Sequence, residues 1–91
     1  LPAVLRFNQG QCEEKYVRLR QAMGLAPGAD LAEAIEGMNR AIGIPSGLGE
    51  MGITEGDIPE MIAYAQKDLA ARSNPRRASD AEFEAMIREA F

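Results

Sequence analysis

The chain has 91 residues, of which 46% are apolar, and it carries a net charge of −4. A chain of this length can bury one modest core, and its apolar share excludes wholesale disorder. Histidine is absent and Cys12 is the only cysteine, which excludes Ser-His-Asp triads, the usual structural zinc sites and an internal disulfide.

The chain is predicted to begin with the tail of a helix. Leu1, Val4 and Leu5 repeat at helical spacing, and Asn8 with Gly10 favours a stop. No initiator methionine is present, so the chain is expected to begin inside a longer protein.

A second helix is expected over roughly residues 12–23, with Tyr16, Leu19 and Met23 sharing its apolar face. The third helix begins after Asp30, whose carboxylate suits a helix N-terminus, and Gly43 ends it. Its apolar stripe has the clearest helical periodicity in the chain: Leu31, Ala34, Ile35, Met38 and Ile42.

A glycine-rich connection follows over residues 46–52, with one helical turn expected at residues 48–51. Thr54 and Asp57 have the spacing of a capping box and introduce a fourth helix. The fourth helix is expected to reach the break at residues 73–76, with these residues on one side: Ile58, Met61, Ile62, Ala65 and Leu69.

Ser79 and Glu82 form a second capping box, which opens the last helix. Its apolar stripe consists of Phe83, Met86, Ile87 and Ala90. We expect Phe83 and Ile87 to pack on the apolar stripe of the fourth helix. The whole pattern predicts an all-α fold of four amphipathic helices plus an N-terminal helical stub.

The residues offer few candidates for chemistry. Residues 47–52 match G-x-G-x-x-G, but a helix and Pro45 precede them where a nucleotide site needs a strand, so the match is interpreted as chance. Asp57 and Glu60 are interpreted as a helix start rather than a metal site, and Cys12 as an ordinary helix-start residue.

The most suggestive polar cluster is Asn74-Pro75-Arg76-Arg77. Arginine suits the recognition of phosphate or carboxylate through its fork of donors. A solvated loop between two helices is the alternative interpretation, and both stay open.

The expected partners follow from charge and hydropathy. Acidic and basic residues are interspersed along the helices, and only the short run of residues 72–77 is basic, which argues against nucleic-acid binding. No apolar run approaches the roughly 20 residues that cross a bilayer. The lone cysteine fits a reducing, cytoplasmic location.

Four stretches, in order along the whole chain, resemble the iron-containing (group III) alcohol dehydrogenases. Residues 1–8 resemble the family's "LPxVxxFN" stretch, and Lys15-Tyr16 leads the second helix as in that family. Residues 43–48, 51–53 and 57–59 are similar to its "GIPxxL…xGV…DIP" connection, and Asn74-Pro75-Arg76 resembles its "NPR" loop.

The resemblance implies that residues 1–91 are the C-terminal part of the all-helical domain of a dehydroquinate-synthase-like, NAD(P)-linked alcohol dehydrogenase. The nucleotide-binding domain and the helices that carry one Asp and three His ligands for iron, zinc or another divalent metal would lie outside this chain. The segment itself would bind no metal or cofactor, and the parent enzyme would act on a small alcohol or aldehyde. It is expected to be a cytoplasmic homo-oligomer.

The resemblance also suggests three residues for the wall of the substrate cleft: Ala70, Asn74 and Arg76. Some relatives carry cysteine where this chain has Ala70, which puts a thiol role there in doubt. No catalytic residue is assigned to this chain. The alternative function is an autonomous helical interaction module without enzymatic activity; the enzyme-segment hypothesis differs in predicting an exposed apolar face.

Overall fold

The computed structural model describes residues 1–91 and contains six α-helices, three 3₁₀ turns and no strand. This confirms the all-α prediction. The α-helices are α1 (Pro2–Asn8), α2 (Glu13–Ala22), α3 (Leu31–Ala41), α4 (Ile58–Lys67), α5 (Leu69–Ser73) and α6 (Asp80–Glu89). The 3₁₀ turns are η1 (Gln9–Gln11), η2 (Leu48–Met51) and η3 (Glu55–Asp57).

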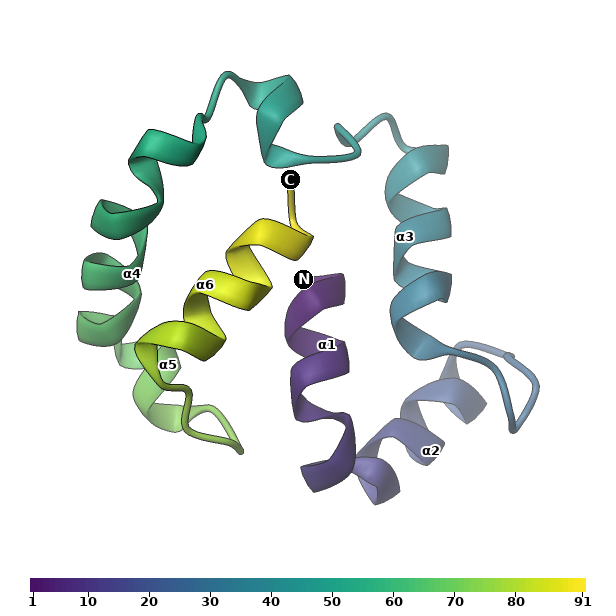
Figure 1. Ribbon diagram of the computed structural model, residues 1–91. Coiled ribbons are helices and arrows are strands. Elements are labelled where there is room, and N and C mark those ends of the chain that lie inside the picture. Colours follow the sequence, from purple (N-terminus) through teal and green to yellow (C-terminus); the bar gives the residue numbers. More distant parts are fainter.

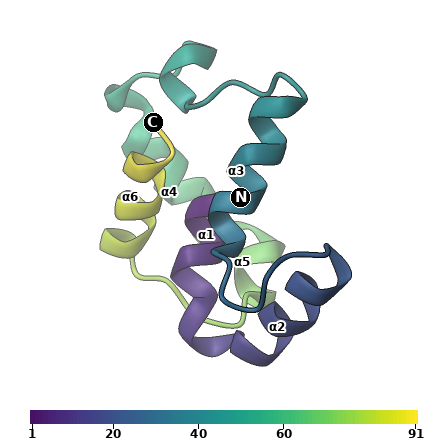
Figure 2. The same ribbon diagram turned by 90° about the vertical axis from the view of Figure 1, so that its right-hand side faces the viewer.

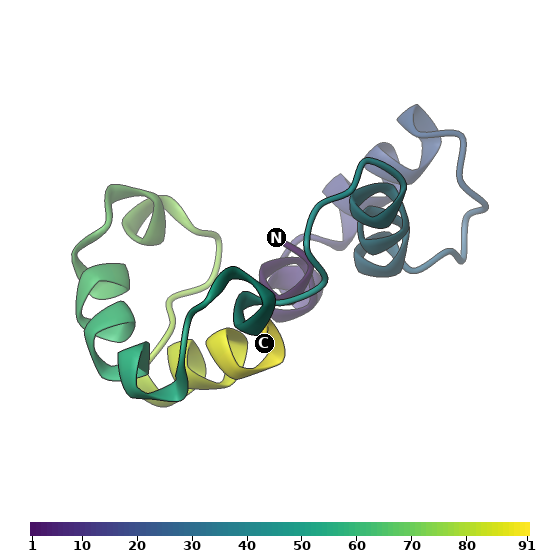
Figure 3. The ribbon, with the colours of Figure 1, turned by 90° about the horizontal axis from the view of Figure 1, so that it is seen from above.

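Helices α1 and α6 pack against each other at the centre, with α3 against α1 and α4 against α6 (Figure 1). Seen from above, α4, α5 and α6 gather on one side and α2 and α3 on the other, with α1 between them (Figure 3). The connection from α3 to α4 passes the end of α6 (Figure 2), where the Leu48 amide donates to the Ala90 carbonyl at 2.8 Å.

Local sequence signals determine most helix ends. The Ser79 amide donates to Glu82 Oε2 at 2.9 Å and the Glu82 amide donates to Ser79 Oγ at 3.2 Å, which completes the predicted capping box of α6. The Asp30 carboxylate caps α3 by accepting from the Glu33 amide at 3.1 Å. Gly43 follows α3 with a φ of +78°, a conformation that favours glycine.

The predicted fourth helix is wrong at its C-terminal end, because α4 stops at Lys67. Asp68 has extended backbone angles, and its Oδ1 accepts from the Ala70 amide at 2.7 Å to cap the separate short helix α5. An aspartate side chain competes in this way with a continuing helix. Leu69 is consequently 75% exposed instead of lying on the α4 stripe.

The main apolar cluster lies where α2 meets the start of α3. Cys12, Tyr16 and Leu31 are buried together, and Leu5, Met23 and Leu25 pack around them. The Tyr16 hydroxyl donates to the Leu5 carbonyl at 2.8 Å, so its polar end is satisfied.

The prediction for Leu19 on this apolar face is wrong, because Leu19 is 44% exposed while the neighbouring Arg20 is buried. Arg20 Nε donates to the Ala29 carbonyl at 2.7 Å, and its guanidinium approaches Glu13 at 3.4 Å. The buried guanidinium is therefore paired and ties α2 to the loop before α3.

The rest of the molecule is lightly packed, with nine buried residues in all. Helix α6 packs against α4 as predicted, and Phe83 and Ile87 are partly buried. The last part of the α3 stripe is uncovered, since Met38 is 53% and Ile42 is 73% exposed. This is the exposed apolar surface expected of a segment from a larger helical domain. No helix combines the length and the apolar character that crossing a membrane requires.

Candidate functional site

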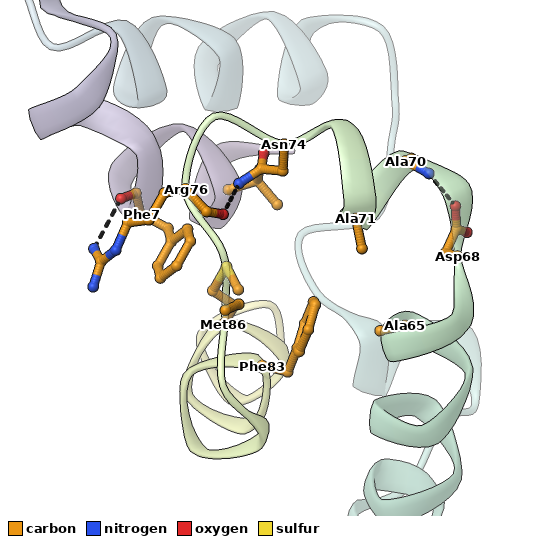
Figure 4. A pocket seen from close by; sticks show the side chains of 11 residues that line it. Phe7, Ala65, Asp68, Ala70, Ala71, Asn74, Arg76, Phe83 and Met86 are labelled. Atoms are coloured by element: carbon orange, nitrogen blue, oxygen red, sulfur yellow. Dashed lines mark hydrogen bonds between the residues drawn. The ribbon is translucent and has the colours of Figure 1, made fainter.

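The three residues suggested for a substrate cleft, Ala70, Asn74 and Arg76, border one pocket of about 280 Å³ (Figure 4). The pocket lies between α1, the end of α4, α5, the 74–79 loop and α6. Its other lining residues are Val4, Phe7, Ala65, Asp68, Ala71, Ala78, Phe83 and Met86. Small and aromatic side chains therefore make an apolar space that a short carbon chain can fill.

The break between α4 and α5 creates one wall of this pocket. Asp68 ends α4, and its cap on α5 turns the chain so that Ala71 points into the space opposite Phe83 (Figure 4). Ala65 borders the same space from the last turn of α4. A continuous helix through Leu69 would not place both alanines on the pocket wall.

Asn74 holds the 74–79 loop against the end of α1. The Asn8 Nδ2 donates to Asn74 Oδ1 at 2.7 Å, and the Asn74 Nδ2 donates to Asn8 Oδ1 at 2.8 Å. Asn74 Nδ2 also donates to the Arg76 carbonyl at 2.5 Å. Asn8 is 7% exposed, so this reciprocal pair is largely removed from water.

Sequence reasoning missed Asn8, which it used only as a helix-stop signal. Its partner is 66 positions away, and no spacing rule connects residues so far apart. Its position at the end of the "LPxVxxFN" stretch was the one signal that could have marked it.

Arg76 fastens the same loop to two helices. Its guanidinium lies over the Phe7 ring, with the central carbon 4.0 Å from the ring centre, and Nη1 donates to the Phe7 carbonyl at 3.1 Å. Nη2 donates to Glu82 Oε1 at 2.6 Å. The Ser79 amide, which donates to Glu82, lowers the pKa of that carboxyl, and the charge of Arg76 lowers it further. Asn74 and Arg76 thus stiffen the pocket wall with polar groups already engaged inside the chain.

The other motifs behave as packing elements. Cys12 is a buried member of the apolar cluster. Residues 47–52 contain η2, and no strand precedes them. A Cβ at Gly47 would overlap the Phe91 backbone, so this position needs glycine for close packing rather than for phosphate. No group of three or more His, Cys, Asp or Glu side chains is placed to hold a metal ion.

A family model described as "Fe-containing alcohol dehydrogenase family, C-terminal" matches residues 1–91. The chain is 40% identical over 95 residues to a 4-hydroxybutyrate dehydrogenase of Cupriavidus necator, covering 100% of this chain and 25% of that protein. It is 35% identical over 99 residues to a 1,3-propanediol dehydrogenase of Klebsiella pneumoniae, covering 100% and 26%.

A lactaldehyde reductase of Escherichia coli (strain K12) is 34% identical over 87 residues, covering 87% of this chain and 23% of that protein. The chain therefore spans about a quarter of the length of these curated relatives. No solved structure matches it significantly.

Proposed function

The chain belongs to the iron-containing alcohol dehydrogenase family, as part of its C-terminal region, and on that premise we propose that it forms a helical wall of the substrate cleft in a longer dehydrogenase. The longer protein would interconvert a small alcohol and its aldehyde or ketone with NAD or NADP. The observation that carries the proposal is the convergence of Ala70, Asn74 and Arg76 on one apolar pocket.

In this proposal the pocket binds the carbon skeleton of the substrate. Phe7, Phe83 and Met86 supply apolar surface that excludes water, while Ala65 and Ala71 leave room for the chain. Asn74 and Arg76 act on the shape of the wall through Asn8, Phe7 and Glu82 rather than by offering free polar groups.

The metal and the nucleotide belong to the remainder of the protein in this proposal. A divalent metal would polarise the alcohol oxygen, and a nicotinamide would accept the hydride. The acidic residues and the single cysteine of this chain are not grouped in a way that fits a metal ion. Residues 1–91 would then be part of an all-helical domain, separate from a nucleotide-binding domain. The cytoplasmic location and the homo-oligomeric state stay predictions.

The exposed apolar residues support a segment over an autonomous interaction module. Leu1 and Ile42 are more than two-thirds exposed, at 74% and 73%, and so is Leu69 at 75%. A self-sufficient module of this size would bury such side chains, since it depends on one small core. These residues are expected to be covered by the rest of the protein.

The proposal is tested in the full-length protein by narrowing the pocket. Ala71→Leu adds a branched side chain to the pocket wall, and Ala70→Leu does so one position earlier. We expect kcat/KM for 1-butanol to fall by about 10–100-fold, because a pocket discriminates each methylene by about 1–3 kcal/mol. The value of kcat/KM for methanol or ethanol should fall less than that for 1-butanol.

Ala63→Leu is the matched control, because Ala63 is an exposed α4 residue that does not border the pocket. An equal loss for short and long alcohols, or an effect of Ala63→Leu as large as that of Ala71→Leu, would contradict the assignment. Residues 1–91 alone should reduce neither NAD⁺ nor NADP⁺ with any alcohol and added metal.

A further inference from the structure

The apolar repeat of α4 would carry one more leucine toward the pocket around Phe83 if the helix continued. Ala65 borders the pocket from the last turn of α4, and Leu69 follows it by four positions. Residues four positions apart on an α-helix lie on the same face. A continuous helix would therefore place the Leu69 side chain next to Ala65, in the space that faces Phe83 (Figure 4).

The chain takes a different course at Asp68. Its backbone is extended, with a φ of −68° and a ψ of 134°, and its Oδ1 accepts from the Ala70 amide at 2.7 Å. Leu69 is consequently 75% exposed, and Ala71 points into the pocket opposite Phe83 (Figure 4). The break therefore puts an alanine on the pocket wall and leaves the leucine outside.

Helix α5 depends on contacts at its two ends, because none of its five residues is buried. The Asp68 cap holds its first turn, and at its other end Asn74 pairs with Asn8. So short a helix is marginal without such support. Asp68→Ala removes the capping oxygen and supplies the best helix former, so it favours a continuous helix from α4 through Leu69.

We propose that Asp68 is a positioning residue that keeps Leu69 out of the pocket and thereby sets the length of the carbon chain that the pocket accepts. The inference rests on the proposed dehydrogenase function and adds a determinant of its specificity. Asp68 acts through the course of the backbone rather than by binding substrate, since its Oδ1 is engaged by the Ala70 amide.

The first test measures chain-length preference in the full-length protein, as the ratio of kcat/KM for 1-butanol to that for ethanol. Asp68→Ala should lower this ratio by about 10-fold or more, because the leucine side chain takes space from the longer alcohol. Asp68→Asn keeps an equally good N-cap, so its ratio should stay within about 3-fold of the wild-type ratio. Asp68→Glu keeps the charge but is a good helix former, so it should lower the ratio as Asp68→Ala does.

A second substitution separates the position of Leu69 from a general loss of structure. Leu69→Ala added to Asp68→Ala should recover most of the wild-type ratio, although the cap is still absent. Mere disorder of α5 would not be repaired by a further truncation. Leu69→Ala alone should leave the ratio unchanged, because Leu69 already lies outside the pocket. If Asp68→Ala does not fold, Asp68→Glu gives the same comparison.

Asp30→Ala is the matched control. Asp30 caps α3 through the same kind of bond to a backbone amide, at 3.1 Å, and does not border the pocket. Its loss should lower the melting temperature without changing the ratio of the two alcohols.

The outcomes separate this inference from the proposed function. In a protein that oxidises both alcohols, a ratio unchanged by Asp68→Ala and Asp68→Glu overturns the inference and leaves the proposed function standing. A low ratio that persists after Leu69→Ala is added also overturns it. A protein that oxidises no alcohol removes the proposed function. The crystal structure of Asp68→Ala then decides the inference: Leu69 beside Phe83 upholds it, and Leu69 still outside the pocket overturns it.

Discussion

The cluster around Tyr16 and the pocket around Phe83 are built in opposite ways. Around Tyr16, apolar side chains fill the space between α2 and α3, and one hydroxyl is satisfied inside. Around Phe83, small side chains leave about 280 Å³ open, and hydrogen bonds at the rim hold the walls apart. Burial of apolar side chains around Tyr16 stabilises the segment. The pocket around Phe83 contributes less burial, because its space stays open.

The largest loss of unfolding free energy is expected from truncating Tyr16 in the main apolar cluster. Tyr16→Ala removes a buried aromatic ring and should destabilise the full-length protein by about 3–5 kcal/mol, as measured by urea unfolding. Tyr16→Phe keeps the ring and loses only the bond to the Leu5 carbonyl, so its cost should be about 1 kcal/mol. Similar costs for the two variants would mean that the ring is not the source of the stability.

The next effect comes from breaking the amide pair at the pocket rim. Asn8→Ala leaves the partner amide of Asn74 without its reciprocal bonds in a largely buried place, at a cost of about 1–3 kcal/mol. Because both residues serve one contact, the double variant with Asn74→Ala should cost less than the sum of the single variants, by about 1 kcal/mol or more. Additive costs would show that the two amides act separately.

A smaller effect is expected at Arg76, which is partly exposed. Arg76→Met keeps an apolar stem over Phe7 but removes the bonds to the Phe7 carbonyl and to Glu82, so we expect a loss of about 1 kcal/mol or less. Under the proposed function, KM for a pocket-filling alcohol should rise while the core around Tyr16 is unaffected. Tyrosine fluorescence reports on the core around Tyr16, and steady-state kinetics report KM. Measuring both on the same preparation separates an effect on the pocket from an effect on the core.

The two regions also differ in how far the sequence predicted them. Helix starts depend on residues three or four positions apart, so Asp30 and the Ser79–Glu82 box were found from spacing alone. The break at Asp68 was not predicted, because the apolar repeat is also compatible with a continuous helix through Leu69. The Asp68 side chain instead accepts from the Ala70 amide and starts a separate helix. On α2, Arg20 displaced Leu19 from the buried side because the Ala29 carbonyl offered it a partner that local periodicity does not contain.

The pocket was predicted as three separate residues and not as a space. Ala70, Asn74 and Arg76 came from the family resemblance, whereas Phe83 was expected only to pack on α4. The contacts that shape the pocket join positions 66 and 69 residues apart, as in Asn8–Asn74 and Phe7–Arg76. Such pairs depend on the packing of α1 against α6, which no local pattern specifies.

The smallest effect is a pH dependence confined to the rim of the pocket. The pKa of Glu82 lies below its ordinary value of 4.5, chiefly because its carboxylate accepts from the Ser79 amide. A depressed folded-state pKa means that the stabilisation is fully present above the ordinary value and is lost as the pH falls through the folded value. Glu82→Gln retains a capping acceptor and cannot ionise, so wild type should be the more stable protein at neutral pH and the difference should shrink in acid. Melting temperatures of both proteins between pH 7 and pH 3 test this, and a difference that widens on acidification would contradict the assignment of Glu82 as the ionised partner of Arg76.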